Sequence, residues 1–223
     1  MLFALGEPVA FAALVVAFLL ALLLRAFAIR LTARMLGLTE RGEPIGPRPR
    51  DDIDPFGAVA AAIGGMGWGK IASVDEIPRW RGRGRAAAVF LSGPLLCIVV
   101  AQLFFAAYAY STPENLLGIL HPSYLLRGGV ALPFGEQVLL CLGTGLLTFG
   151  LLALIPLPPL DGFGVMWSIP KHAGPGLQWI RLWFEDKNIG VLLLLVCCFF
   201  PFSYPLLLGL LDLLGVLFLR LWG

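Results

Sequence analysis

Charged residues are scarce in this chain: Asp, Glu, Lys and Arg make up 13% of its 223 residues. Soluble domains carry about a quarter charged residues, which argues against a single water-soluble core. Hydrophobic residues account for 59%, and the mean hydropathy is +0.88. Several apolar runs reach the ~20 residues that a helix needs to cross a bilayer. The composition therefore predicts an integral membrane protein that crosses the lipid bilayer several times.

Histidine is also scarce, since only His121 and His172 are present. The four cysteines lie inside apolar runs and show neither a paired zinc-binding spacing nor the framework of a secreted disulfide protein. We expect them to be buried as small hydrophobic side chains. A net charge of +2 gives no reason to expect a nucleic-acid partner. The cysteines are Cys97, Cys141, Cys197 and Cys198.

The apolar runs predict an all-α bundle in a single domain, residues 1–223. Its C-terminal apolar region, 189–222, would measure about 51 Å as one helix. Pro201 and Pro205 either break it into two short spans or kink one tilted helix, so the count is four or five. The piece Ala58–Gly69 is too short and too glycine-rich to span, which favours a short re-entrant or edge segment. The expected spans are about 8–36, 86–110, 137–155, 189–200 and 205–222.

The basic residues predict an orientation. Of 16 Lys and Arg, 11 lie between Arg25 and Arg85. Because basic loops stay in the cytoplasm, loops 39–85 and 162–188 are expected to be cytoplasmic, with the N-terminus outside. A cleaved signal peptide is not expected, since Glu7 stands where a basic residue would precede the apolar run. Trp183 and Trp222, near span ends, are typical of interfacial aromatic residues.

Four segments, in order, carry a resemblance to a known family. Ile155–Gly162 reads I-P-L-P-P-L-D-G and is the most specific. The other three are I-D-P-F-G at Ile53–Gly57, G-W-G-K at Gly67–Lys70 and L-S-G-P-L at Leu91–Leu95. Together they resemble the small bacterial branch of the site-2 protease family, which are intramembrane zinc metalloproteases. The resemblance implies a site-2-protease-like transmembrane helix bundle in the bacterial inner membrane.

The catalytic motif of that family is missing here. Its first conserved helix carries H-E-x-x-H, in which two histidines bind zinc and the glutamate is the general base. The resemblance places this motif at Arg25, Ala26 and Ile29, which are neither ligands nor a base. Of the family's zinc ligands only Asp161 remains, and a catalytic zinc needs three protein ligands. We therefore expect a pseudoenzyme without zinc. Three further polar family positions are altered, at Asp52, Cys97 and Ala153.

The same resemblance implies that positions 25 and 161 converge, because in the family they ligate one metal ion. An unpaired carboxylate within a membrane is costly, and ionisable groups there normally pair. We hypothesise that Arg25 and Asp161 form an ion pair that takes over the structural task of the metal. In the alternative, Arg25 extends to the lipid headgroups and Asp161 caps the turn after Pro158-Pro159.

Four functions remain open at this point. The first is a structural or accessory subunit of a membrane complex, with other integral membrane proteins as partners. The second is a regulatory pseudoprotease that binds a transmembrane helix without cutting it. The third is a metalloprotease with a rebuilt site that uses His121 or His172, although the predicted topology puts these on opposite sides. The fourth is a binder of lipid or a small apolar ligand in the vacated cleft.

Overall fold

The computed structural model describes residues 1–38, 45–46, 48–70, 77–112, 116–129, 132–199 and 205–223. Within these ranges the chain is helical and contains no β-strand, only one isolated antiparallel bridge between Ile53 and Gly69. The prediction of an all-α fold is therefore confirmed for the part of the chain that the structure describes.

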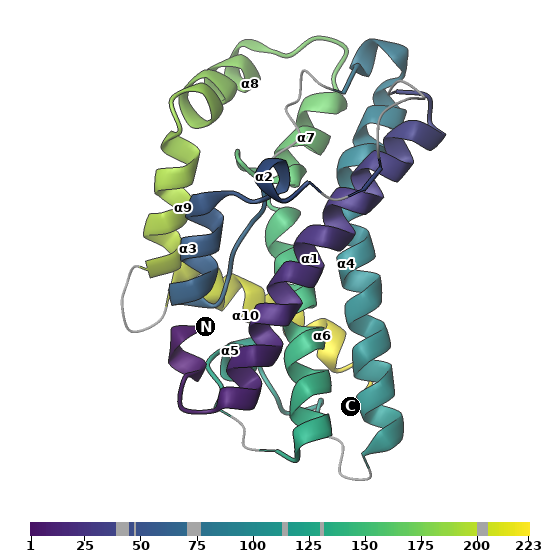
Figure 1. Cartoon of the computed structure of the whole chain (residues 1–223). Helices are drawn as coiled ribbons and strands as arrows, with labels where there is room; N and C mark the ends of the chain where they lie inside the picture. The colour runs from purple at the N-terminus through teal and green to yellow at the C-terminus, as the bar shows by residue number, and fades with distance from the viewer. Residues whose placement is uncertain (39–44, 47, 71–76, 113–115, 130–131, 200–204) are drawn as a thin grey trace.

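Three long helices form the centre of the molecule (Figure 1). α1 spans Pro8–Met35, α4 spans Arg83–Ser111 and α6 spans Phe134–Ala153, and each packs against the other two. All three are long and apolar enough to cross a membrane. At 1.5 Å per residue even α6, the shortest, measures about 30 Å, the thickness of the hydrocarbon layer. The coarse prediction of several membrane-spanning helices agrees with this arrangement.

Small side chains let the three long helices approach closely. A Cβ added at Gly143 of α6 would lie 2.7 Å from the ring of Phe105 in α4. One added at Gly145 would lie 2.6 Å from the Cβ of Ala17 in α1. Membrane helices use small residues at such contacts because association there depends on close van der Waals packing. The relative positions of α1, α4 and α6 are thus set by glycines and alanines.

Shorter helices surround this centre. The C-terminal pair, α9 and α10, measures about 16 Å and 21 Å, so neither helix alone matches the hydrocarbon layer. Pro205 directly precedes α10, whereas Pro201 lies outside the described residues. The count of four or five spans stays a prediction for this region. The shorter α-helices are α2 (Pro49–Asp52), α3 (Pro55–Gly64), α5 (Pro122–Leu126), α7 (Asp161–Ser168), α8 (Pro175–Ile180), α9 (Ile189–Phe199) and α10 (Leu206–Leu219); the 3-10 turns are η1 (Leu2–Ala4) and η2 (Arg79–Arg81), and a π turn, η3, covers Arg181–Asp186.

The region predicted as a short re-entrant or edge segment, Ala58–Gly69, contains most of a helix. α3 begins at Pro55, and the side chain of Asp54 caps it by accepting a hydrogen bond from the amide of Phe56. It ends where Gly65 adopts a left-handed conformation with φ of 77°. A cap, a proline in the first turn and a run of alanines favour this helix despite the glycines. Residues 66–70, after the turn at Gly65, are not helical.

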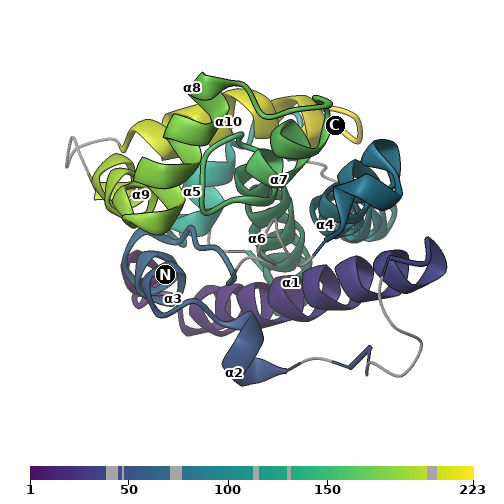
Figure 2. The same cartoon turned by 90° about the horizontal axis from the view of Figure 1, so that it is seen from above.

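Much of the predicted loop 162–188 is helical as well, since it contains α7, α8 and η3. In the view from above, α3, α8 and α9 lie on one side and α4 on the other, with α6 and α7 between them (Figure 2). α3 and α9 are in contact. The helical content of this region positions the residue of greatest interest, Asp161, at the start of α7.

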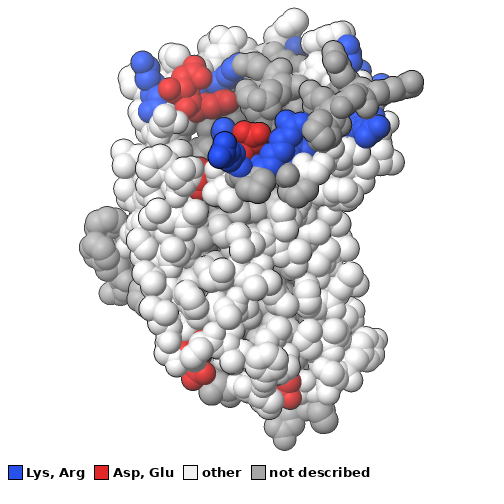
Figure 3. All heavy atoms as spheres, viewed as in Figure 1, with Lys and Arg blue, Asp and Glu red and all other residues white. Residues whose placement is uncertain are grey.

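Charge is concentrated at one end of the molecule. Lys, Arg, Asp and Glu gather at the upper end in Figure 3, where Figure 1 places α2, α7 and α8. The remainder of the visible face is almost uncharged, with acidic side chains only near its lower end. An uncharged band beside a charged end is expected of a protein that lies in a bilayer and whose loops on one side of the membrane carry most of the charge.

Candidate functional site

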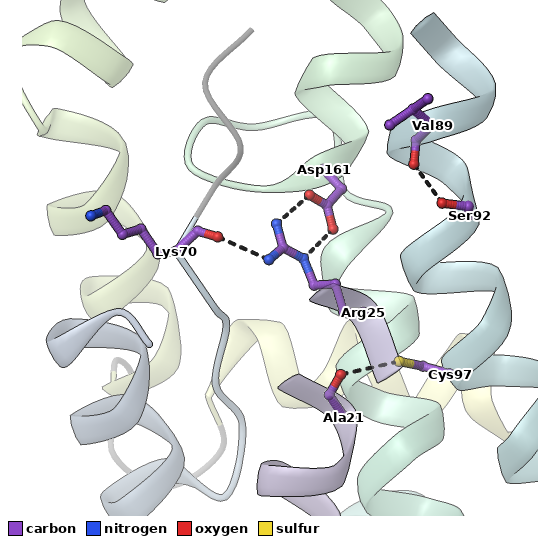
Figure 4. Close-up of polar contacts among 7 residues, drawn as sticks. All are labelled: Ala21, Arg25, Lys70, Val89, Ser92, Cys97 and Asp161. Atoms are coloured by element: carbon purple, nitrogen blue, oxygen red, sulfur yellow. Dashed lines mark hydrogen bonds and ion pairs between the residues drawn. The ribbon is translucent and has the colours of Figure 1, made fainter. Parts of the chain in front are cut away.

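Arg25 and Asp161 form a buried, bidentate ion pair (Figure 4). Arg25 lies on α1, and its Nε donates to Oδ2 of Asp161 at 2.6 Å while its Nη2 donates to Oδ1 at 2.5 Å. Arg25 is 5% exposed and Asp161 is 1% exposed. Planar guanidinium and carboxylate groups match in this geometry, which gives the strongest class of charge-assisted hydrogen bond. The pair connects the middle of α1 to the first residue of α7.

A third contact ties the guanidinium to the extended segment after α3. Nη1 of Arg25 donates to the carbonyl oxygen of Lys70 at 2.9 Å. The amide of Lys70 in turn donates to the carbonyl of Asp52 at 2.9 Å, beside the bridge between Ile53 and Gly69. One side chain therefore joins three parts of the chain that are distant in sequence: α1, the start of α7 and residues 65–70.

Glycines make room for the arginine. A Cβ added at Gly93 of α4 would lie 2.8 Å from Cγ of Arg25, and one at Gly69 would lie 3.2 Å from Nη1. Both distances are shorter than ordinary van der Waals contacts, so the arginine fits because these two positions lack side chains. Gly93 and Gly69 thus form two walls around the buried cation.

The loop before α7 fixes the position of Asp161. Leu160, in extended conformation, precedes α7, and Asp161 occupies its first turn, where a negative charge interacts favourably with the helix dipole. Gly162 packs against the end of α6 so closely that a Cβ there would lie 2.2 Å from the carbonyl oxygen of Leu154. The carboxylate is held by this loop and aimed at α1.

The side chain of Asp54 connects the start of α3 to the segment that follows the helix. Besides capping α3, its Oδ2 accepts a hydrogen bond from the indole nitrogen of Trp68 at 2.6 Å. Trp68 is 2% exposed, and a Cβ added at Gly57 would lie 2.1 Å from its carbonyl oxygen. These contacts hold residues 65–70 against α3, and so present the carbonyl of Lys70 to Arg25.

A second ion pair lies further along α1. Nη1 of Arg30 donates to Oδ2 of Asp52 at 3.2 Å, and Nη2 contacts Oδ1. The side chains of Arg30 and Asp52 are 23% and 13% exposed, whereas those of Arg25 and Asp161 are 6% and 1% exposed. Partial exposure lowers the energetic value of a pair, because water screens its charges. Arg30–Asp52 is therefore a natural internal control for the buried pair.

Apolar side chains occupy the other two positions singled out in the sequence. Ala26 is 5% exposed, and Ile29 is 7% exposed within a cluster that includes Phe90 and Phe163. His121 and His172 are both exposed, the first before α5 and the second between α7 and α8. The structure therefore brings together Arg25 and Asp161, and neither histidine joins them.

Zinc does not fit this donor set. Both oxygens of Asp161 accept hydrogen bonds from Arg25, and a guanidinium offers donors but no lone pair to a metal. Among the described residues, no group of three or more His, Cys, Asp or Glu side chains gathers closely enough to hold a metal ion. The absence of zinc itself stays a prediction. Chemically, the site offers a satisfied ion pair that holds elements in place.

Reasoning from the sequence missed several contributors to the site. The carbonyl of Lys70 is a backbone group, so no side-chain pattern indicates it. Gly93 and Gly69 lie within the segments quoted above, but their sequence does not reveal what they border. Cys97 also lies close by, with its thiol 3.6 Å from the carbonyl oxygen of Ala21. The segments were a usable signal for these positions, although not for their roles.

A scan against protein-family models and searches of curated proteins and of solved structures found no match to this chain.

Proposed function

We propose that this chain is a catalytically inactive homologue of the site-2 proteases that serves as a structural or accessory subunit of a membrane protein complex. The observation that carries the proposal is the paired geometry of Arg25 and Asp161. The resemblance assigns both positions to ligands of one metal ion, and their side chains meet. A guanidinium at that point holds the carboxylate without supplying a nucleophile or activating water.

The arrangement of the four segments adds support. Gly69 and Lys70 of the second segment, Gly93 of the third and Asp161 of the fourth all border Arg25. The first segment, through Asp54, holds the second in place. We take the convergence of these segments, which are spread over more than 100 residues, as support for their likeness to the family.

The proposal gives the ion pair a structural task. In a catalytic metal site the ion ties its ligand-bearing helices together while it performs the chemistry. Here Arg25 ties α1 to α7 and to residues 65–70, which preserves the arrangement of the helices without the metal. Because the helices keep their arrangement, the outer surfaces of the bundle are also kept. In this proposal a partner subunit binds those surfaces. The finer fold proposed is a site-2-protease-like bundle of four or five spans.

The proposed setting is the bacterial inner membrane, with the N-terminus outside. Of the loops assigned to the cytoplasm, the described residues of 39–85 before α3 and those of 162–188 lie toward the charged end (Figures 1 and 3). α3 runs away from that end to η1, where the amino group of Met1 donates to the carbonyl oxygen of Ala61. Residues 39–44, 47 and 71–76 lie outside the described part of the chain. The partners proposed are other integral membrane proteins, since the visible face away from the charged end is almost uncharged (Figure 3).

Purification from native membranes tests the function directly. The C-terminally tagged protein is extracted in mild detergent, and copurifying proteins are quantified against an untagged control. The expected result is a defined set of integral membrane partners at fixed stoichiometry. Recovery of the chain alone would contradict the subunit proposal. Recovery with varied single-span proteins at low ratios would instead favour the regulatory pseudoprotease that binds helices without cutting them.

A matched pair of variants sharpens the experiment. Arg25→Ala removes the link between α1 and α7, whereas Arg30→Ala removes the more exposed pair on the same helix. If the buried pair maintains the bundle that partners recognise, the first variant loses copurifying subunits and the second retains them. If both variants retain the copurifying subunits equally, complex formation does not depend on the Arg25–Asp161 pair.

A further inference from the structure

α8 and the π turn η3 together form a helical segment, Pro175–Asp186, at the charged end of the molecule (Figures 1 and 2). No residue of either element is buried. The segment nevertheless has two distinct sides. One faces α7, and the other faces away from the protein.

The outward side is apolar. Trp179 is 56% exposed, Leu182 is 49% exposed and Trp183 is 43% exposed. Their i, i+3, i+4 spacing puts them on one face of a helix, and the two indole rings lie 6.1 Å apart. We call these three side chains the tryptophan face.

The inward side holds an ion pair beside apolar side chains. Arg181 stacks its guanidinium on the ring of Trp167 in α7, with 5.1 Å between the guanidinium carbon and the ring centroid. Its Nε lies 3.7 Å from Oε2 of Glu185, and both side chains are partly buried, at 26% and 20% exposure. Leu177 and Ile180 also turn inward, where they pack against the buried cluster that includes Phe90 and Phe163. The inward side therefore carries both apolar and charged groups, while the tryptophan face stays exposed.

Three large apolar side chains at the surface are favourable where the medium around them is apolar. We propose that Pro175–Asp186 lies in the boundary between the headgroups and the acyl chains, with the tryptophan face inserted among anionic phospholipids. Tryptophan is enriched at this depth because its ring is apolar and its N–H is polar. Exposed Lys171 precedes the segment and exposed Lys187 follows it, where they meet the phosphate groups. Asp186, also exposed, ends the segment.

Exposed apolar side chains appear again in the next helix, after the exposed polar residues Asp186, Lys187 and Asn188. α9 follows after Asn188, which turns the chain with a φ of 56°. Leu192 of α9 is 62% exposed and Val196 is 44% exposed. A lipid-facing helix that runs on from the tryptophan face places both on one boundary of the bilayer. Through Arg181 and Trp167 the segment also braces α7, whose first residue is Asp161. This inference does not depend on the proposed function.

Fluorine NMR distinguishes lipid from water at each tryptophan. The protein is labelled with 5-fluorotryptophan and placed in nanodiscs of phosphatidylglycerol, and each resonance is assigned by a single Trp→Phe variant. One sample contains lipid with a spin label near the headgroup, and another contains a water-soluble paramagnetic chelate. Trp68, which is 2% exposed, is the buried control.

The expected result is strong broadening of the Trp179 and Trp183 resonances by the spin-labelled lipid and weak broadening by the chelate. Trp68 should respond little to either. Broadening by the chelate alone would overturn the inference, because the tryptophan face would then lie in water. Protection from both agents would overturn it too, since a protein surface would then cover the face. A repeat in phosphatidylcholine nanodiscs should weaken the lipid effect, and an unchanged effect would contradict the preference for anionic headgroups.

Discussion

At the scale of single residues, the molecule depends on the guanidinium of Arg25. Taking two charges out of water costs several kcal/mol per ion, and only excellent geometry offsets that cost. Here the carboxylate of Asp161 matches two of the nitrogens and the carbonyl of Lys70 accepts from the third. Each partner is therefore tolerable only in the presence of the other.

A double-mutant cycle measures this dependence. Asp161→Asn and Arg25→Ala should each lower the free energy of unfolding by about 3–5 kcal/mol, because each leaves a buried group uncompensated. The double variant should lose markedly less than the sum, since it leaves no charge behind. Denaturant unfolding in detergent, followed by tryptophan fluorescence, gives the values. Strictly additive losses would rule out a coupled pair.

The Arg30–Asp52 pair is the control for that cycle. It has similar chemistry but more exposed side chains, so its coupling energy should not exceed about 1 kcal/mol. An equal or larger coupling at this pair would mean that burial does not decide the energetics.

The glycine wall beside Arg25 provides a second test. Gly93→Ala puts a methyl group 2.8 Å from Cγ of a side chain that is fixed at its far end, so it should cost about 1–3 kcal/mol. In an Arg25→Ala background that cost should shrink, because Cγ is gone. Thermal unfolding in detergent compares them. Gly84→Ala, on the same helix with open space around it, should be neutral or stabilising.

Much of the site could be predicted from the sequence, and what could not has a physical explanation. The meeting of Arg25 and Asp161 follows from a resemblance that puts both positions around one ion. The carbonyl of Lys70 could not be predicted, because its orientation depends on the bridge between Ile53 and Gly69 and not on the identity of its side chain. The role of Gly93 likewise depends on where α4 crosses α1, which no local pattern reveals.

At the scale of elements, α3 shows what length and glycine content leave open. They favoured a short re-entrant or edge segment, and the cap at Asp54 and the alanines give that segment a helix of 10 residues. The long helices were easier, because an apolar run of more than 20 residues has few alternatives in a bilayer. Residues 162–188 were harder to predict, since α7, α8 and η3 have only 8, 6 and 6 residues and such short helices leave little periodic pattern.

The cap of α3 is expected to be important beyond its own helix. Asp54→Ala removes both the acceptor for the amide of Phe56 and the acceptor for the indole of Trp68. The loss of stability should reach about 2 kcal/mol, which is the upper range for a helix cap, because a nearly buried indole N–H also loses its partner. Asp51→Ala, at an exposed acid in α2, is the control and should change little. Denaturant unfolding measures both, and equal effects would contradict the role of Asp54.

At the scale of the whole molecule, polarity is arranged along one axis. The charged end holds α2, α7 and α8, and the long helices run away from it through an uncharged band (Figures 1 and 3). The positive-inside rule predicts from this asymmetry that the charged end faces the cytoplasm. Three glycines with open space around them, Gly84, Gly135 and Gly176, offer reporter positions along that axis.

Cysteine labelling at these glycines tests the orientation. Gly84→Cys and Gly176→Cys lie at the charged end and should react with a membrane-impermeant maleimide only in inside-out vesicles. Gly135→Cys, at the start of α6 and thus at the other end, should react only in right-side-out spheroplasts. Unmodified protein is the control for Cys197, the one native cysteine that is not fully buried. The reverse pattern would invert the topology, and labelling of all three from one side would contradict a transmembrane arrangement.

Zinc content of a restored motif tests the central claim most directly. Unmodified protein and Arg25→His/Ala26→Glu/Ile29→His are purified, passed through a chelator-free sizing column and measured by plasma mass spectrometry. We predict no bound zinc in the first and about one ion per chain in the second, where two histidines and Asp161 complete a three-ligand site. A stoichiometric ion in the unmodified protein would contradict the claim that Arg25 stands in place of the metal. A folded triple variant without zinc would contradict the assigned register and the family resemblance that supports it.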